Sequence, residues 1–117
     1  TLIELLNLGS AAYRRLVRRS ALRRISRESL QRNAAVALGN SNDPRAVAPL
    51  ARALRSHPSA LVRAHAAWAL GQLRRWLDRD ARDALKEASS HDDDPYTRES
   101  AQRARLGLVT ESEPSAL

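Results

Sequence analysis

The sequence contains no cysteine, and this absence excludes several kinds of chemistry. Without a thiol, the chain forms no disulfide and offers no thiolate ligand to a metal ion or an iron–sulfur cluster. It also has no cysteine nucleophile. No apolar run approaches the roughly 20 residues that a helix needs to cross a bilayer, so we expect a folded, soluble domain.

Aromatic residues are also scarce, at 3% of the 117 positions, and phenylalanine is absent. Alanine and leucine dominate the apolar residues, whereas β-branched residues are few. Because helices favour Ala and Leu while strands favour β-branched and aromatic residues, the composition predicts an all-α fold. The length suits one domain with one core. The chain starts at Thr1 without the pattern of a signal peptide, and we expect it to be a piece of a longer protein.

Residues 43–73 have the pattern of a helical hairpin. Asp43 followed by Pro44 is typical of an N-cap with proline at the first helical position. The apolar spacing after Pro44 predicts a helix of about 13 residues, with a kink at Pro49. A break at 57–59 ends this helix, and a second apolar stripe follows over residues 62–73.

The hairpin pattern repeats along the chain. Residues 30–39 match residues 62–71 at a constant offset of 32, and a weaker third copy begins at Asp94 and Pro95. We therefore expect one domain over residues 1–109 and a disordered tail at 110–117. The predicted units are leading helices at 1–28, a first repeat at 29–56, a second repeat at 59–89 and a degenerate last unit at 94–109.

The repeat length and the shared sequence Ala-x-Ala-Leu-Gly resemble HEAT-type helical repeats. Residues 20–25, 32–40 and 57–69, with the opening Leu2–Leu6, more specifically resemble the C-terminal HEAT-like region of bacterial epoxyqueuosine reductases. The resemblance implies a cytoplasmic parent oxidoreductase that converts epoxyqueuosine to queuosine in tRNA, using cobalamin and two 4Fe–4S clusters. It places those cofactors upstream, in a ferredoxin-like catalytic domain of the same chain. The present chain would then hold no cofactor, perform no catalysis and bind tRNA.

Positive charge is concentrated in the N-terminal part. Residues 1–75 carry 14 basic and 3 acidic side chains, a net charge of +11, whereas residues 76–117 carry 6 basic and 10 acidic ones, a net of −4. Guanidinium groups match phosphate geometry, so we predict RNA-phosphate contacts from the eight arginines between positions 14 and 32. They are Arg14, Arg15, Arg18, Arg19, Arg23, Arg24, Arg27 and Arg32. The alternative is a solvated face whose arginines cap helices or pair with Glu4 and Glu28.

Arg63 is the candidate for a structural ion pair. In HEAT-like repeats an arginine at this place often pairs with an aspartate of a neighbouring repeat, and Asp43 and Asp94 are the predicted partners. RNA contact is the alternative. The run at 92–94 lacks the alternating oxygen ligands and distal glutamate of a calcium loop, so we interpret it as helix capping before Pro95 and predict no metal site.

Two other functions fit the same composition. A protein-interaction scaffold would bind an acidic protein through the basic surface, and a bracing domain would only support the catalytic part. We interpret Trp68 as a core residue and His65 as an interhelical one. Asn33 is expected to bond to a loop backbone. Tyr13, beside the arginines, is the aromatic candidate for stacking on an unpaired base.

Overall fold

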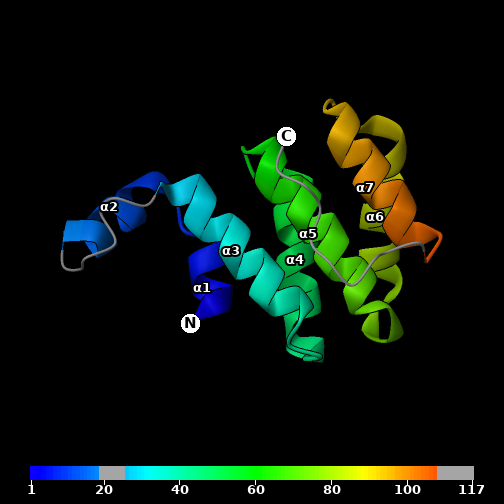
Figure 1. The fold of residues 1–117 in the computed structure, drawn as a ribbon, viewed down its shortest axis with the longest axis horizontal. Coiled ribbons are helices and arrows are strands. Elements are labelled where there is room, and N and C mark those ends of the chain that lie inside the picture. The colour runs from blue at the N-terminus through cyan, green and yellow to red at the C-terminus, as the bar shows by residue number, and fades with distance from the viewer. Residues whose placement is uncertain (19–25, 108–117) are drawn as a thin grey trace.

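The computed structural model describes residues 1–18 and 26–107, and all regular elements in these ranges are helical (Figure 1). The all-α prediction is confirmed. The α-helices are α1 (Leu2–Leu6), α2 (Ser10–Arg18), α3 (Arg27–Gly39), α4 (Val47–Ser56), α5 (Ala60–Gln72), α6 (Arg79–His91) and α7 (Pro95–Arg105). Two short 3-10 helices, η2 (Pro44–Ala46) and η3 (Arg74–Trp76), precede α4 and α6. The predicted tail at 110–117 lies outside the described residues.

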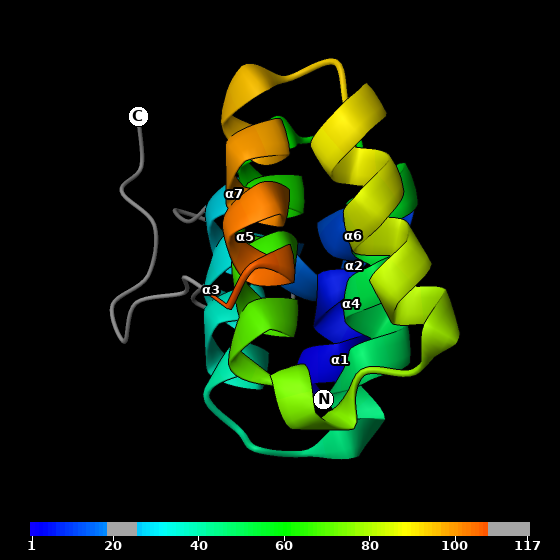
Figure 2. The ribbon, with the colours of Figure 1, turned by 90° about the vertical axis from the view of Figure 1, so that its right-hand side faces the viewer.

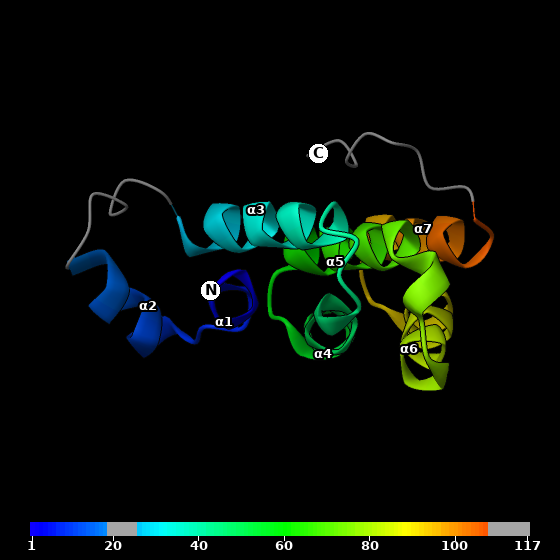
Figure 3. The same ribbon diagram turned by 90° about the horizontal axis from the view of Figure 1, so that it is seen from below.

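The helices pack in two layers (Figures 2 and 3). One layer contains α3, α5 and α7 side by side, and the other contains α1, α4 and α6. Across the layers, α1 packs on α3, α4 on α5, and α6 on α7. The predicted units at 29–56 and 59–89 group α3 with α4 and α5 with α6, so they are shifted by one helix from the observed pairs.

The helices of the first layer begin after polar N-cap residues, and one of these caps, the one before Pro95, was predicted. Ser26, Ser59 and Asp94 are the N-caps of α3, α5 and α7, and each accepts a hydrogen bond from the backbone N–H three residues later. Such a bond satisfies one of the four N–H groups that a helix start leaves unpaired. Local sequence therefore fixes where each of these helices begins.

Pro49 does not kink a helix, contrary to the prediction. The residues expected to form one helix divide into the 3-10 turn η2, capped by Asp43, and the helix α4, which begins at Val47. Pro49 is the third residue of α4, where a backbone N–H has no intrahelical acceptor. The missing donor of proline consequently costs this helix nothing.

Small residues allow α3 and α5 to approach closely. Gly39 is buried, and a Cβ atom built on it would lie 2.9 Å from both Cα and Cβ of Ala69. The Cζ3 atom of Trp68 would be 3.0 Å away. Glycine is therefore required at this crossing. Trp68 is 5% exposed and lies in the core, as predicted.

Helix α2 lies apart from the two layers (Figures 1 and 3). It belongs to the segment that connects α1 with α3, which runs from residue 7 to residue 26. The corresponding connections of the other two pairs, 57–59 and 92–94, have three residues each. The Arg27 guanidinium donates a hydrogen bond to Ser10 Oγ at 2.6 Å, so the two ends of the long connection meet. Helix α2 is thus part of an insertion in the first hairpin.

Candidate nucleic-acid interface

The predicted RNA-binding arginines lie on the insertion and on α3. The structure describes the side chains of four of them: Arg14, Arg15, Arg27 and Arg32. Arg18 is the last residue of α2, but its side chain, together with Arg19, Arg23 and Arg24, lies outside the described part. The structure therefore places half of the predicted set.

Arg14 and Arg15 are exposed on α2, and neither belongs to an ion pair between described residues. Arg27 and Arg32 are half-buried and donate to neutral oxygens. Arg27 bonds to Ser10, and Arg32 donates to Asn33 Oδ1 through Nε and Nη2 at 3.3 and 3.1 Å. Asn33 thus accepts from a neighbouring side chain, not from a loop backbone as predicted. None of the four arginines belongs to an ion pair among the described residues.

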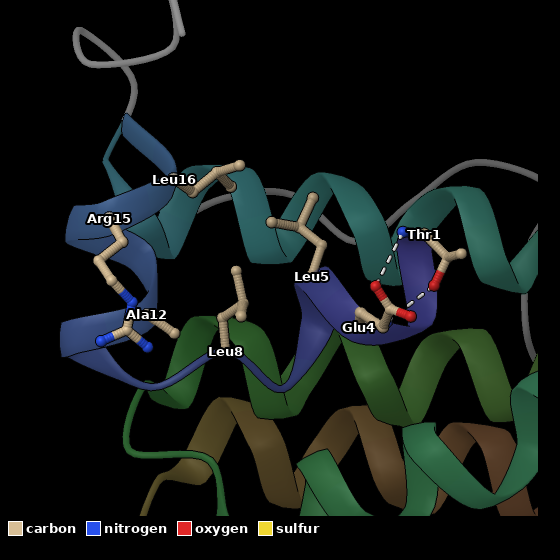
Figure 4. A pocket seen from close by; sticks show the side chains of 7 residues that line it. All are labelled: Thr1, Glu4, Leu5, Leu8, Ala12, Arg15 and Leu16. Carbon is tan, nitrogen blue, oxygen red and sulfur yellow. Dashed lines mark hydrogen bonds and ion pairs between the residues drawn. The ribbon is translucent and has the colours of Figure 1, made fainter. Parts of the chain in front are cut away.

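A groove that the sequence did not reveal lies between α1 and α2 (Figure 4). Its volume is about 490 Å³, and apolar side chains from both helices and from the loop between them line it: Leu5, Leu8, Ala12 and Leu16. Arg15 stands at the α2 side of this groove, and Glu4 closes the other end, where it bonds to the Thr1 amino group at 3.4 Å. Leu16 is 36% exposed, so the groove presents apolar surface beside an exposed arginine.

Polar side chains at equivalent positions of α3, α5 and α7 connect successive helix pairs. Gln31 is the first of these side chains, and its Nε2 donates to the carbonyls of Leu5 and Leu8, both at 3.0 Å. Its Oε1 lies 2.7 Å from Nε2 of His57, in the loop of the next pair. Gln31 therefore ties its own hairpin loop to the following one.

Arg63 occupies the equivalent position on α5 and makes the predicted kind of contact with different partners. Its Nη1 donates to the carbonyls of His57 and Pro58, its Nε to Asp92 at 3.0 Å, and its Nη2 to Asp93 at 3.0 Å. The side chains of Arg63 and Asp92 are only 13% and 8% exposed. The ion pair with the neighbouring repeat is thus present and mostly buried.

The prediction that Arg63 pairs with Asp43 or Asp94 is wrong. Asp43 pairs with Arg45 in its own turn at 2.9 Å, and Asp94 accepts from the backbone and the hydroxyl of Thr97. These local contacts lower the pKa of both carboxyl groups.

Arg98 on α7 occupies the position equivalent to Gln31 and Arg63, and it donates to the Asp92 carbonyl at 2.6 Å. We refer to Gln31, Arg63 and Arg98 as the polar ladder.

His57 takes part in the polar ladder as a neutral side chain. The backbone N–H of Ser59 donates to Nδ1 at 3.0 Å, so the ring proton is on Nε2 and is donated to Gln31. Burial lowers the pKa of His57, and the charges of Arg27 and Arg63 lower it further. The histidine serves as a structural donor between two hairpins.

The described residues offer no metal centre. No group of three His, Asp or Glu side chains among them is placed to hold an ion. The acidic run at 92–94 instead binds Arg63 and caps α7. Within the same described ranges, no helix has the length and apolar character needed to cross a membrane.

Stacked helix pairs, a glycine contact between first-layer helices and a ladder of polar bonds are features of a helical solenoid. The family model of HEAT repeats matches residues 16–104, most of the chain. The chain belongs to the HEAT-repeat family. No curated protein and no solved structure matches it. HEAT-repeat domains bury their core between neighbouring hairpins and present extended surfaces to partners. Residues that contact a partner are therefore expected on the surface of this domain.

Proposed function

We propose that this HEAT-repeat domain is a non-catalytic RNA-binding module that holds tRNA through the arginines of α2 and the segment after it. The observation that carries the proposal is the state of Arg14 and Arg15. Both are exposed on an inserted helix, without an acidic partner among the described residues. RNA phosphates would supply the missing negative charge.

The spacing of the arginines supports a polyanionic ligand. Arg14 and Arg18 are four residues apart on α2, and such like-charge pairs destabilise a helix by about 0.2–0.5 kcal/mol. Neither Arg14 nor Arg15 forms an ion pair with a described residue in return. A bound phosphate backbone would offset the repulsion and add charge-assisted hydrogen bonds.

The sequence resemblance supports a more specific proposal for the parent protein. Residues 20–25, 32–40 and 57–69 are similar to the C-terminal region of epoxyqueuosine reductases, which act on tRNA in the cytoplasm. Cobalamin and two 4Fe–4S clusters would belong to a ferredoxin-like domain of the same parent chain. The present residues include no cysteine, so their part would be to bind the tRNA. Cysteines spaced as in two-cluster ferredoxins, found upstream in the parent gene, would support this proposal, and their absence would contradict it.

Binding of tRNA to the 117-residue chain, followed by fluorescence anisotropy over a range of salt concentrations, tests the RNA proposal. The test variant is Arg14→Glu with Arg15→Glu. The matched control is Arg52→Glu with Arg79→Glu, which changes the net charge equally at two exposed arginines elsewhere. Each lost phosphate contact should flatten the slope of log K against log salt by about 0.7–0.9, so the test variant should flatten it by about 1.4–1.8.

The comparison between the two double variants decides the outcome. The control should lose little affinity, because Arg52 and Arg79 are not expected to contact RNA phosphates directly. Circular dichroism verifies that both variants keep their helices. Equal affinity and equal salt slope in the two folded variants would contradict RNA binding by α2.

The groove between α1 and α2 favours a second candidate function, a scaffold for an acidic protein partner. Its apolar lining beside Arg15 would suit an amphipathic helix with acidic residues on its polar face. Leu16→Ser separates the two candidates, because it removes apolar surface without changing charge. Loss of binding to a synthetic acidic amphipathic peptide, with tRNA affinity unchanged, would support the scaffold.

A further inference from the structure

A second basic site lies at the opposite end of the solenoid from α2 (Figure 1). A recess of about 430 Å³ is formed by η3, α6 and α7. Its basic lining residues are Arg74, Arg82, Lys86 and Arg105, and its acidic lining residue is Asp83. Four positive charges against one negative charge give the lining a net charge of +3.

The cations of this recess are not engaged by carboxylates of the described chain. Arg74, Arg82 and Lys86 belong to none of the ion pairs between described residues. Arg105 donates only to neutral oxygens, Ser89 Oγ at 3.2 Å and Gln102 Oε1 at 3.1 Å. By contrast Arg55, on α4, binds Asp80 at 2.6 Å and approaches Glu87 at 3.6 Å. Two of the three acids of α6, Asp80 and Glu87, thus face Arg55 on a neighbouring helix, and the third, Asp83, lines the recess, whose net charge stays positive.

The recess is assembled from three elements that bring the cations together. Arg82 and Lys86 are one turn apart on α6, and Arg105 is the last residue of α7. Arg74 packs against Gly107, whose φ is 71°, because the Arg74 guanidinium occupies the space where a Cβ would stand. Glycine at position 107 thus leaves room for the arginine, because it has no Cβ.

Apolar side chains form the floor. Leu77, Leu85 and Ala104 line the recess and are 8%, 1% and 1% exposed. A low-polarity floor strengthens the attraction between the cations and an anion above it. The volume lies within the range of small-molecule sites, so the recess has room for an anionic group and part of the molecule that carries it.

We propose that this recess is a phosphate-binding site. Arginine forks bind phosphate oxygens in pairs, and lysine adds a compact charge. Two sources share this chemistry: a free phosphorylated small molecule, and a backbone phosphate of RNA. The RNA source rests on the proposed function, and it would place contacts at both ends of a body whose longest extent is 41 Å.

The experiment uses the 117-residue chain with two probes, inorganic phosphate followed by NMR and tRNA followed by anisotropy. The test variant is Arg82→Gln with Lys86→Gln, and the control is Arg52→Gln with Arg79→Gln, exposed cations that do not line the recess. The test variant should weaken phosphate binding by about tenfold or more, the equivalent of losing a charged hydrogen bond. Asp83→Asn removes the single acid of the lining and should strengthen phosphate binding.

The two probes distinguish the sources and separate this site from α2. If the test variant weakens both phosphate and tRNA binding, the site takes RNA phosphate; if it weakens phosphate binding alone, the site takes a small phosphorylated molecule. Phosphate binding that is equal in test and control variants, or unaltered by Asp83→Asn, would overturn the proposal. A wild-type chain that binds phosphate at the recess but no tRNA would refute RNA binding by α2 and leave this site standing.

Discussion

The insertion and the stacked helices differ in the pairing of their arginines. On η2, α4, α5 and α7, Arg45, Arg55, Arg63 and Arg103 bind carboxylates at 2.9, 2.6, 3.0 and 3.1 Å, whereas the recess arginines Arg82 and Arg105 bind no carboxylate of the described chain. On α2, Arg14 and Arg15 are exposed and have no such partner among the described residues. The difference shows that an excess of arginine does not by itself make a binding surface. What matters is whether the fold places acids beside the cations.

The largest expected contrast lies between Arg63 and Arg14. Arg63→Met would leave Asp92 buried without its partner and two loop carbonyls without a donor, so we expect a loss of about 3 kcal/mol in the free energy of unfolding. Arg14→Met should change it by less than about 0.5 kcal/mol. Urea denaturation measures both. Similar losses in the two variants would remove the distinction between structural and free arginines.

Glycines provide the next contrast. Gly39→Ala would bring a Cβ to 2.9 Å from the Ala69 backbone, and overpacking of this kind costs about 1–3 kcal/mol. Gly9, next to α2, has nothing within 4 Å of an added Cβ. Because the Gly9 carbonyl accepts from the Tyr13 N–H at the start of α2, Gly9→Ala should cost only the difference between Gly and Ala at a helix N-cap, less than about 1 kcal/mol. Thermal unfolding of the two variants tests whether close packing is confined to the solenoid body, and a tolerated Gly39→Ala would argue against it.

His57 makes the stability of the ladder depend on pH. Its pKa is lowered in the folded state, so this contribution is complete above the unfolded value of about 6.5 and is lost as the pH falls through the folded value. His57→Gln should remove this dependence and cost about 1 kcal/mol at pH 7.5 through the altered bond to Gln31. Melting temperatures between pH 7.5 and 5 measure the difference. Identical pH profiles for wild type and variant would contradict a neutral, buried His57.

The smallest effect is expected at an exposed pair within α7. Glu99 and Arg103 lie four residues apart, with side chains 59% and 57% exposed. Arg103→Gln should cost about 0.3–0.5 kcal/mol at low salt and almost nothing at high salt, because solvent and ions screen such pairs. Denaturation at two salt concentrations tests this. A loss as large as that of Arg63→Met would show that exposure does not govern the strength of these pairs.

Local signals in the sequence predicted the helical hairpin at 43–73 and the cap before Pro95. Asp43, Asp94 and the apolar spacing after each cap act over a few residues, so their effect is independent of distant parts of the chain. The partner of Arg63 was harder to predict, because it depends on competition within one loop. Thr97 engages the carboxylate of Asp94, and Asp92, two residues earlier, is left to face Arg63.

The recess between α6 and α7 could not be predicted from charge along the sequence. Residues 76–117 have a net charge of −4, yet Arg82, Lys86 and Arg105 lie in one recess. The net charge of a sequence segment adds up residues from all faces of its helices, whereas in the folded protein the residues on one face lie together. The sequence did not predict the groove beside α2 for the same reason, since Leu5 and Leu16 come from different helices.

The meeting of Ser10 and Arg27 has a consequence for how this protein can change. Because the long connection leaves and re-enters the first hairpin at neighbouring points, its length is not set by the solenoid. Gln31 anchors the hairpin at Leu5 in α1 and at Leu8, the second residue of the connection. A three-residue turn like that at 57–59 could replace residues 9–25 while the stacked helices remain. In this sense we expect the basic segment to be modular: its replacement should leave the stacked helices in place.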